Sequence, residues 1–398
     1  MNAFLWYDDP NHGVQLFCGD CREVMAEMEA ELVDAVVCDP PYGINFMGKG
    51  WDHGVPGAEF WAEAFRVTKP GGHLLAFGGT RTYHRLACAI EDAGWELRDC
   101  LSWLYGSGFP KSLDVSKAID KAAGVEREVV GSYRVSGNAL TPTKDKGGTY
   151  GVGVLNSPPG YLSITVPATS EAQQWDGWGT ALKPAWEPIV LARKPLVGNV
   201  AQNVLAYGTG GLNIDGCRIE GVKGVPASPR RAAQNASYGE LGNDPGNGSG
   251  WNPDVGRWPA NVVLDEVAAT LLDAQTGGSG GVSRFYYVAK ASRSERERGL
   301  ESDVPVAAAS EQLCDLSEKG SVPSRVSARH NIHPTVKPIA LMRWLVRLVT
   351  PPDGLVLDPF VGSGSTMIAA CLEGVRCAGI DTEEAYLDIA AGRINAWS

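Results

Sequence analysis

The sequence predicts an α/β protein with a mostly parallel sheet that is covered by helices on its faces. Three observations carry this prediction. Apolar segments of strand length alternate with helical patterns at both ends of the chain. One strand ends at a Pro-Pro step, and a glycine-rich turn joins a strand to a helix near the C-terminus. Such alternation favours parallel strands, because each crossover helix returns the chain to the same edge of the sheet.

The first 105 residues contain the first group of elements. Valine and other β-branched residues mark the strands, and apolar residues at helical spacing mark the helices. One helix is expected to close at the Pro-Gly-Gly of residues 70–72. The expected strands are residues 14–20, 33–38, 73–79 and 95–105, and the expected helices are residues 21–31, 60–72 and 81–94.

The α/β rhythm breaks in two long middle regions. Residues 106–182 are rich in Gly, Ser, Pro and Thr, with one helical piece at 113–124. Residues 198–329 are irregular and include a mixture of strand and turn at 202–216. A convincing strand at 186–194 separates the two regions. Regions of this length are rarely plain linkers, so we interpret them as functional insertions or a partly disordered second lobe.

Regular structure returns at the C-terminus. Strand and helix alternate again there, and a glycine-rich turn separates the first strand from the helix that follows it. The expected helices are residues 339–349, 367–374 and 383–397, and the expected strands are residues 355–358 and 375–381.

The bulk composition limits the class of protein. The chain has 398 residues and a formal net charge of −11, which argues against a surface coated in positive charge for non-specific nucleic-acid binding. No apolar run reaches membrane-spanning length, and the N-terminus lacks the pattern of a signal peptide, so we expect a cytoplasmic protein with no membrane partner. Cys18 and Cys21 form a C-x-x-C pair without a second pair of metal ligands. We interpret them as reduced cysteines beside a turn and expect no metal.

The glycine-rich turn DPFVGSGST, residues 358–366, indicates a nucleoside-binding site. Gly362 and Gly364 let the backbone approach a ligand, and the next helix directs its first N–H groups toward that ligand. Asp381 ends the following strand, where a carboxylate can accept hydrogen bonds from ribose hydroxyls. The turn matches neither the G-x-G-x-x-G pattern nor a P-loop. It places Phe360 and small hydroxyl residues beside the ligand, which suits S-adenosylmethionine, since that nucleoside has no pyrophosphate to bind.

The order of the strands predicts where this site lies. The chain ends 17 residues after Asp381, so the remaining strands of the sheet must come from the N-terminal half. Asp20 and Asp39 each follow a strand in that half, and ligands of such sheets lie beyond the carboxyl ends of the strands. We therefore expect Asp20, Asp39, Gly362 and Asp381 to converge on one crevice of a circularly permuted sheet.

The motifs together resemble those of the amino-methyltransferases that modify exocyclic nitrogens of DNA bases. DPPY at Asp39–Tyr42 is similar to their catalytic motif, DPFVGSGST to their cofactor motif, and HPTVKP at His333–Pro338 to the segment that covers the cofactor. The catalytic motif precedes the cofactor motif, which matches the beta-type, permuted class. The resemblance implies a Rossmann-like, S-adenosylmethionine-dependent fold with a mostly parallel seven-stranded sheet and large insertions.

The resemblance also assigns roles. Asp39 and the Pro40 carbonyl would accept hydrogen bonds from the amine, Pro41 would help to fix the backbone, and Tyr42 would stack on a base flipped out of duplex DNA. Which hydroxyl of the Ser365–Thr366 pair contacts the cofactor stays open. The residues assigned to the cofactor are Asp20, His333, Thr335, Lys337, Asp358, Phe360, Gly362, Gly364, Ser365, Thr366 and Asp381.

Substrate specificity is a choice between two bases. Asp at position 39 favours the N6 amine of adenine, because cytosine-N4 enzymes of this family more often carry Ser there. N4-cytosine methylation and a catalytically idle DNA-binding relative are the alternatives. The chain would act as a monomer or a homodimer.

Target recognition is expected in the insertions. The basic stretch at residues 283–299 is either part of a DNA-binding face or a solvated helix. Candidate DNA contacts are Arg230, Arg231, Arg257, Arg284, Lys290 and Arg293. The segments are residues 1–105 (catalytic half), 106–182 (insertion), 183–197 (sheet strand), 198–329 (insertion) and 330–398 (cofactor-binding half).

Overall fold

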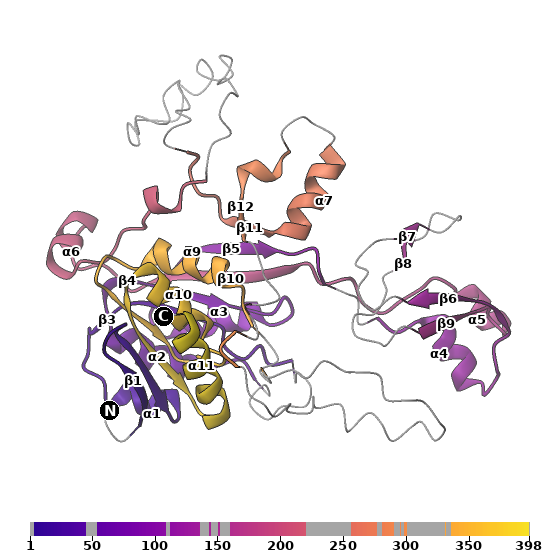
Figure 1. The fold of residues 1–398 in the computed structure, drawn as a ribbon, viewed down its shortest axis with the longest axis horizontal. Helices are drawn as coiled ribbons and strands as arrows, with labels where there is room; N and C mark the ends of the chain where they lie inside the picture. The colour runs from indigo at the N-terminus through magenta and orange to yellow at the C-terminus, as the bar shows by residue number, and fades with distance from the viewer. Residues whose placement is uncertain are drawn as a thin grey trace, which may run out of the picture. The chain divides into compact units, whose positions relative to one another are not determined.

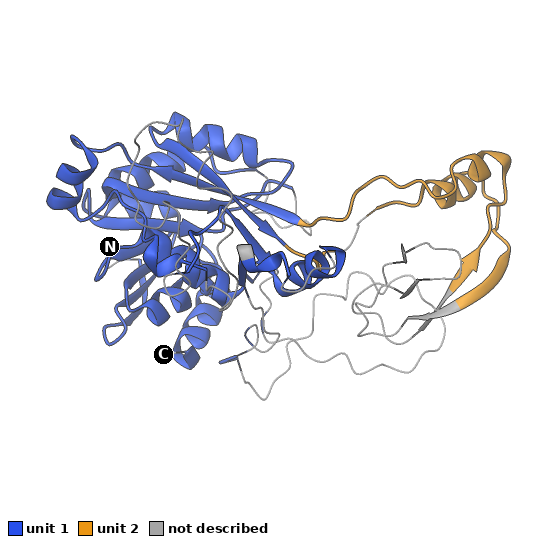
Figure 2. Cartoon of the chain, turned by 90° about the horizontal axis from the view of Figure 1, so that it is seen from above, with its two compact units in different colours: residues 1–104, 186–315, 328–398 blue, residues 105–185, 316–327 orange. Residues whose placement is uncertain are grey.

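The computed structural model divides the chain into two compact units (Figure 2). Unit 1 comprises residues 1–104, 186–315 and 328–398, and unit 2 comprises residues 105–185 and 316–327. The structure describes residues 4–44, 54–108, 112–135, 143–144, 150–151, 160–219, 256–276, 281–289, 295, 298–300, 331 and 336–397.

Unit 1 is built on one mixed sheet. Within the described residues it has ten strands, in the order β1-β2-β14-β13-β3-β4-β10-β5-β11-β12. The strands are β1 (Leu5–Asp9), β2 (Val14–Cys18), β3 (Val33–Cys38), β4 (Thr68–Phe77), β5 (Glu96–Leu104), β10 (Trp186–Arg193), β11 (Val262–Asp265), β12 (Tyr287–Ala289), β13 (Leu355–Asp358) and β14 (Arg376–Asp381).

Most neighbouring strands of this sheet are parallel, as the sequence predicts. From β2 through β14, β13 and β3 to β4 every pair is parallel, and so are β5–β11 and β11–β12. Strand β10 runs antiparallel to both β4 and β5, and β1 runs antiparallel to β2. The expectation of seven strands is wrong in number, because β1 extends one edge of the sheet and β11 and β12 extend the other.

Helices cover both faces of the sheet because alternate strand residues point to opposite sides. In β3, Ala35 and Val37 belong to one apolar cluster, and Val36 and Cys38 belong to the other. Helices α9, α10 and α11 contribute to the first cluster, and α1, α2 and α3 to the second. The helices are α1 (Cys21–Ala26), α2 (Ala58–Val67), α3 (Tyr83–Asp92), α6 (Val200–Tyr207), α7 (Glu266–Thr276), α9 (Ile339–Val349), α10 (Ser365–Glu373) and α11 (Glu384–Trp397), with short 3-10 turns at Asp215–Cys217 and Ser283–Phe285.

The two ends of the chain share the centre of unit 1. The C-terminal strands β13 and β14 lie between the N-terminal strands β2 and β3. In Figure 1 the yellow helices α9, α10 and α11 accordingly lie beside the dark N-terminal strands. This arrangement brings the end of β3 and the end of β13 to the same edge, although more than three hundred residues separate them in the sequence.

Two sequence predictions on local structure are wrong. The Pro-Gly-Gly at 70–72 does not close a helix: α2 ends at Val67, and Pro70 lies within β4. Gly71 adopts a positive φ of 79°, and its backbone N–H donates to the carbonyl of Lys194, just beyond β10. The backbone N–H of Lys194 donates in turn to the carbonyl of Gly72. The mixture of strand and turn at 202–216 instead begins with helix α6, which Asn199 and Gln202 start with a reciprocal capping box.

Unit 2 contains a small helical and β-hairpin assembly. Its elements are α4 (Val115–Ala122), β6 (Val129–Val135), β7 (Thr143–Lys144), β8 (Tyr150–Gly151), β9 (Gly160–Thr165) and α5 (Ser170–Gln174). Strands β6 and β9 pair antiparallel, as do β7 and β8. Buried Asp120 of α4 accepts hydrogen bonds from the backbone N–H groups of Ala168 and Thr169 and so ties the two helices together. Helix α4 confirms the helical piece expected at 113–124.

No helix in the described parts of either unit combines the length and the apolar character needed to cross a membrane.

Candidate active site

Four carboxylates lie in a row at the carboxyl ends of neighbouring strands of the unit 1 sheet. Asp20 follows β2, Asp381 ends β14, Asp358 ends β13 and Asp39 follows β3, and these four strands are neighbours in that order. Because all four strands are parallel, their carboxyl ends share this edge. The structure therefore brings together the acids that the sequence places far apart.

The glycine-rich turn is held from two sides by carboxylates. Asp358 accepts a hydrogen bond from the backbone N–H of Phe360 at 3.0 Å and one from the hydroxyl of Thr366 at 2.5 Å. Asp381 accepts a hydrogen bond from the backbone N–H of Gly362 at 2.8 Å. Gly362 and Gly364 have positive φ angles of 49° and 77°, a region that glycine enters without steric cost. The turn is thus a preformed loop that opens helix α10.

Burial changes the titration of these two acids. It raises the pKa of Asp358 to about 7, and the neighbouring charges of Asp39 and Asp381 act in the same direction. The pKa of Asp381 is also raised, again mainly by burial, although backbone N–H groups oppose the shift. Asp39 acts on Asp358 because these two residues stand at the ends of the neighbouring strands β3 and β13.

Arg393 supports the glycine turn, although it lies outside the turn's sequence motif. This fully buried side chain of α11 donates hydrogen bonds to the carbonyl of Ser363 and, at 3.4 Å, to the hydroxyl of Ser365. The hydroxyl of Thr366 is directed to Asp358 instead. Arg393 lies on the buried face of α11 with Ala390 and Ile394, and this charge among apolar positions was the available sequence signal.

Asp20 and Phe360 border the turn on the β2 side. Asp20 caps helix α1 through the backbone N–H of Arg22, and the guanidinium of Arg22 lies 2.6 Å from its carboxylate. The hydrogen bonds from this guanidinium lower the pKa of Asp20. The Arg22 guanidinium also lies 4.6 Å from the ring centroid of Phe60, and the rings of Phe60 and Phe360 are 6.2 Å apart. Asp20 therefore lies in a polar and aromatic rim beside the turn.

The residues Asp39–Tyr42 form a rigid segment after β3. Pro40 is buried, and the backbone carbonyl of Tyr42 accepts a hydrogen bond from the Thr82 hydroxyl at 2.6 Å. The phenol of Tyr42 donates to one carboxylate oxygen of Asp39 at 2.8 Å. The motif thus folds back on itself, and its aromatic ring and its acid are held in one fixed relation.

Two residues from distant segments complete an ion cluster around this motif. The Lys337 ammonium lies 2.7 Å from the second carboxylate oxygen of Asp39, 3.3 Å from Glu187 and 3.2 Å from the Tyr42 hydroxyl. Glu187 also lies 3.1 Å from the Tyr42 hydroxyl. We call Asp39, Tyr42, Glu187 and Lys337 the Asp39 cluster. Lys337 contacts Asp39 and Tyr42, whereas the resemblance assigns it to the cofactor.

Glu187 is the member that the sequence reasoning missed. It is the second residue of β10 and directly precedes five apolar, buried residues, 188–192. An isolated carboxylate in such a strand costs free energy unless a cation or a hydrogen bond compensates it. That charge in the run WEPIVLAR was the available signal.

The cluster fixes the protonation of its tyrosine and its lysine. Burial and the carboxylates of Asp39 and Glu187 raise the pKa of Tyr42 well above its usual value, so its hydroxyl stays a donor. Burial disfavours the ammonium form of Lys337, but the same two carboxylates outweigh that penalty and raise the pKa of the lysine. Lys337 is therefore charged at neutral pH.

Several of the predicted site residues lie outside the part of the chain that the structure describes. His333, Thr335, Arg230, Arg231, Lys290 and Arg293 lie outside the described residues. Arg257 donates to the carbonyl of Arg284 at 3.1 Å, and burial lowers the pKa of Arg257.

Burial raises the pKa of Cys21 to about 12, and it also raises the pKa of Cys18. Among the described residues no three His, Cys, Asp or Glu side chains are grouped to hold a metal ion.

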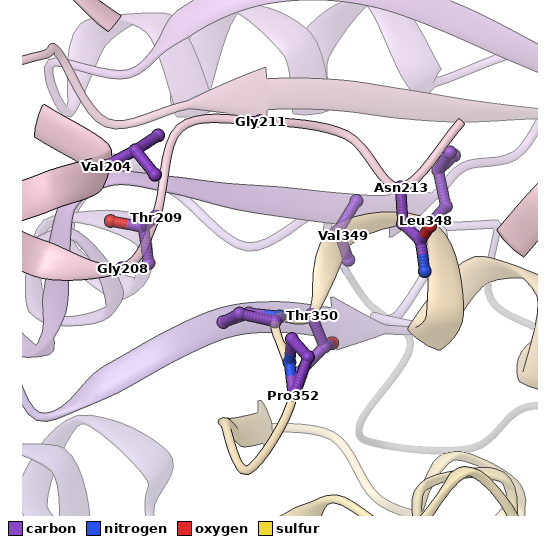
Figure 3. A pocket seen from close by; sticks show the side chains of 10 residues that line it. Val204, Gly208, Thr209, Gly211, Asn213, Leu348, Val349, Thr350 and Pro352 are labelled. Carbon is purple, nitrogen blue, oxygen red and sulfur yellow. The ribbon is translucent and has the colours of Figure 1, made fainter. Parts of the chain in front are cut away.

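A cavity lies at the other end of the sheet. Its volume is about 260 Å³, and Figure 3 shows Val204 and Thr209 on one side and Asn213 and Thr350 among the residues opposite. Pro352 at its wall precedes β13, whereas the glycine turn follows β13. The cavity is therefore separate from the Asp39 cluster and the glycine turn.

Comparison with known proteins identifies a family for the chain. The family model for DNA methylases, the N6/N4 methyltransferases, matches residues 33–121 and 258–392, which is more than half of the chain. The type II methyltransferase M.ScaI of Streptomyces caespitosus is 42% identical over 72 residues, 18% of this chain and 24% of the relative. The type II methyltransferase M2.DpnII of Streptococcus pneumoniae is 42% identical over 77 residues, 19% of this chain and 29% of the relative. The matched stretches thus span about a quarter of each relative's length.

Solved structures resemble the chain more loosely. The M1.HpyAVI–SAM complex aligns with a TM-score of 0.40 and 15% identity, covering 96% of this chain and all of that one. The cytosine-N4-specific PvuII DNA methyltransferase aligns with a TM-score of 0.42 and 11% identity, covering 96% of this chain and 86% of that one. On the strength of the family match, the chain belongs to the N6/N4 DNA methylase family.

Proposed function

We propose that the chain is an S-adenosylmethionine-dependent DNA methyltransferase that methylates the N6 amine of adenine in double-stranded DNA. One observation carries the proposal: the Asp39 segment and the glycine turn end neighbouring parallel strands at one edge of the sheet. Methyl donor and acceptor must lie side by side for direct transfer, and this edge offers a site for each. The order of the two motifs also supports a circularly permuted, beta-type member of the family.

The glycine turn has the features that S-adenosylmethionine requires. Its loop opens helix α10, and the carboxylates of Asp381 and Asp20 lie beside it for ribose hydroxyls. The pattern lacks a P-loop lysine, which fits a nucleoside without phosphates. When bound there, the cofactor supplies an electrophilic methyl group on its sulfonium. We expect Phe360, Gly362 and Gly364 to contact it, with His333 and Thr335 as further candidates.

Asp39, Pro40 and Tyr42 would prepare the acceptor. An exocyclic amine is a weak nucleophile because its lone pair is delocalised into the ring. Hydrogen bonds from the amine to the Asp39 carboxylate and the Pro40 carbonyl favour a pyramidal nitrogen with a localised lone pair. The ring of Tyr42 would stack on a base that has left the helix. Both groups are preorganised, since the segment is held by Pro40, Pro41 and Thr82.

The choice of adenine rests on Asp39. A carboxylate accepts hydrogen bonds from the amine without donating one, and within the family the cytosine-N4 enzymes more often carry serine at this place. The insertions at 106–182 and 198–329 are the proposed carriers of target recognition. Arg257 and Arg284 are candidate DNA contacts among the described residues.

Nucleoside analysis tests the proposal directly. The purified chain is incubated with methyl-labelled S-adenosylmethionine and unmethylated duplex DNA of mixed sequence, and the DNA is digested and analysed by mass spectrometry. We expect labelled N6-methyladenine. Labelled N4-methylcytosine would show that cytosine is the substrate in place of adenine. The absence of any labelled base would overturn the proposal. Asp39→Ala, which removes the acceptor carboxylate, should abolish transfer while S-adenosylmethionine still binds with the wild-type Kd.

A further inference from the structure

The Asp39 cluster contains two carboxylates and one ammonium, so it carries one net negative charge. Asp39 and Glu187 are the two acids, and Lys337 lies within ion-pair distance of both. Burial, together with the two neighbouring carboxylates, raises the pKa of Tyr42 and so holds it in its neutral form. Lys337 is 8% exposed and Asp39 20%, so water screens these charges only in part. The cluster's net charge is therefore a property that single residues can change.

The ammonium group of Lys337 interacts with both carboxylates of the cluster. Lys337 donates to Asp39 at 2.7 Å and lies 3.3 Å from Glu187. If Glu187 carried no charge, the ammonium would neutralise Asp39 alone, and the pair would present no net charge to a substrate. With Glu187 present, the lysine is shared and negative charge remains at the carboxyl end of β3, next to the end of β13 where the glycine turn begins.

The proposed reaction needs that charge. As the amine nitrogen attacks, a nitrogen–carbon bond forms and the sulfur–carbon bond of the sulfonium breaks. The positive charge thereby passes from sulfur to nitrogen until the nitrogen releases one proton to water. A negative carboxylate beside the nitrogen stabilises this charge in the transition state, whereas a fully neutralised carboxylate does so much less.

We propose that Glu187 is a positioning residue that binds Lys337 and so leaves the Asp39 carboxylate negatively charged for the substrate amine. This inference rests on the proposed methyltransferase function. Glu187 acts through Lys337 and Tyr42 and does not itself touch the base. Its carboxylate also holds the Tyr42 hydroxyl, which keeps the ring in place for stacking.

Charge-changing variants of the two partners separate charge from shape. Glu187→Gln keeps the side-chain volume and an acceptor oxygen but removes the charge. We expect kcat for DNA methylation to fall by on the order of ten- to a hundredfold, while the KM for S-adenosylmethionine is unchanged. The double variant Glu187→Gln/Lys337→Met again has one net negative charge, on Asp39. Its kcat should exceed that of Glu187→Gln by roughly tenfold.

A matched control uses the same substitution at an ion pair that involves the other end of β10. Glu96 of β5 pairs with Arg193, at the other end of β10, at 2.7 Å. Glu96→Gln should leave kcat unchanged, since that ion pair lies at the opposite end of β10 from Glu187. If Glu187→Gln is as active as Glu96→Gln, or if the double variant is no better than Glu187→Gln, the charge role of Glu187 is wrong.

Unfolding measurements without DNA distinguish this inference from the proposed function. Urea unfolding is measured for the wild type, both single variants and the double variant. The four midpoints form a double-mutant cycle. We expect the double variant to be more stable than the sum of the single effects predicts, because Lys337→Met alone leaves two carboxylates unpaired. Additive effects would overturn the inference even in an active enzyme. A wild type that transfers no methyl group to DNA would instead overturn the proposed function, and the catalytic role of Glu187 with it.

Discussion

The glycine turn and the Asp39 cluster lie at one edge of one sheet, yet the chain builds them in different ways. The turn is local: its two anchoring acids contact residues 8 and 19 positions away in the sequence. The Asp39 cluster joins residues 145 and 298 positions apart. A local site can be recognised from a short motif, whereas a cluster of this kind exists only after the sheet has assembled. The predictions below test how far this difference extends to function and stability.

Among the variants that compare the two sites, the largest expected effect comes from removing the aromatic ring of the Asp39 cluster. Tyr42→Ala loses both the stacking surface and the hydroxyl that donates to Asp39, so kcat/KM for DNA should fall by about a hundredfold or more. Tyr42→Phe keeps the ring and should lose only about tenfold. Steady-state methylation assays compare the two. Equal losses in both variants would show that the hydroxyl, and not stacking, is what matters.

The glycine turn should respond to a single methyl group. At Gly364, where φ is 77°, an added Cβ would lie 2.9 Å from the Ala390 side chain and 3.1 Å from its backbone. Gly364→Ala should therefore lower the free energy of unfolding by more than the ~1–2 kcal/mol of backbone strain alone and should weaken S-adenosylmethionine binding. Urea unfolding and calorimetry measure the two effects.

Gly374 at the other end of α10 is the matched control for that substitution. Its φ is 71°, and an added Cβ would meet no atom within 4 Å. Gly374→Ala should cost the backbone strain only and leave cofactor binding unchanged. An equal effect of the two variants on binding would contradict the idea that close packing against α11 shapes the turn.

The smallest expected effect is a pH dependence of stability that arises from the glycine turn. The folded-state pKa of Asp358, about 7, is above its ordinary value of 3.8. The folded chain therefore binds more protons than the unfolded chain between about pH 4 and pH 7, and this group's contribution to stability is lost as the pH rises through that window. Asp358→Asn retains an acceptor for the Phe360 N–H and should flatten that part of the profile. Urea unfolding at about pH 5 and pH 8 compares the two proteins; parallel profiles would show that Asp358 does not titrate there.

The helices and strands that build unit 1 follow from local pattern where the pattern is strong. The fully buried strand β3 and the amphipathic helix α9 have the bounds that the sequence predicts. Predictions failed where contacts distant in sequence override a local signal. The Pro-Gly-Gly at 70–72 reads as a helix stop, but pairing with the segment after β10 places it in a strand.

By itself, the sequence determined the α/β class, the motifs at the strand ends and the conformation of the glycine turn. Each of these is indicated by residues close together in the chain, whose spacing and backbone preferences do not depend on which distant segments they contact. Only the tertiary structure decided that Glu187 and Lys337 meet at Asp39 and that Arg393 supports the turn. Buried charges must find partners, but which segments supply them depends on the order of strands in the sheet.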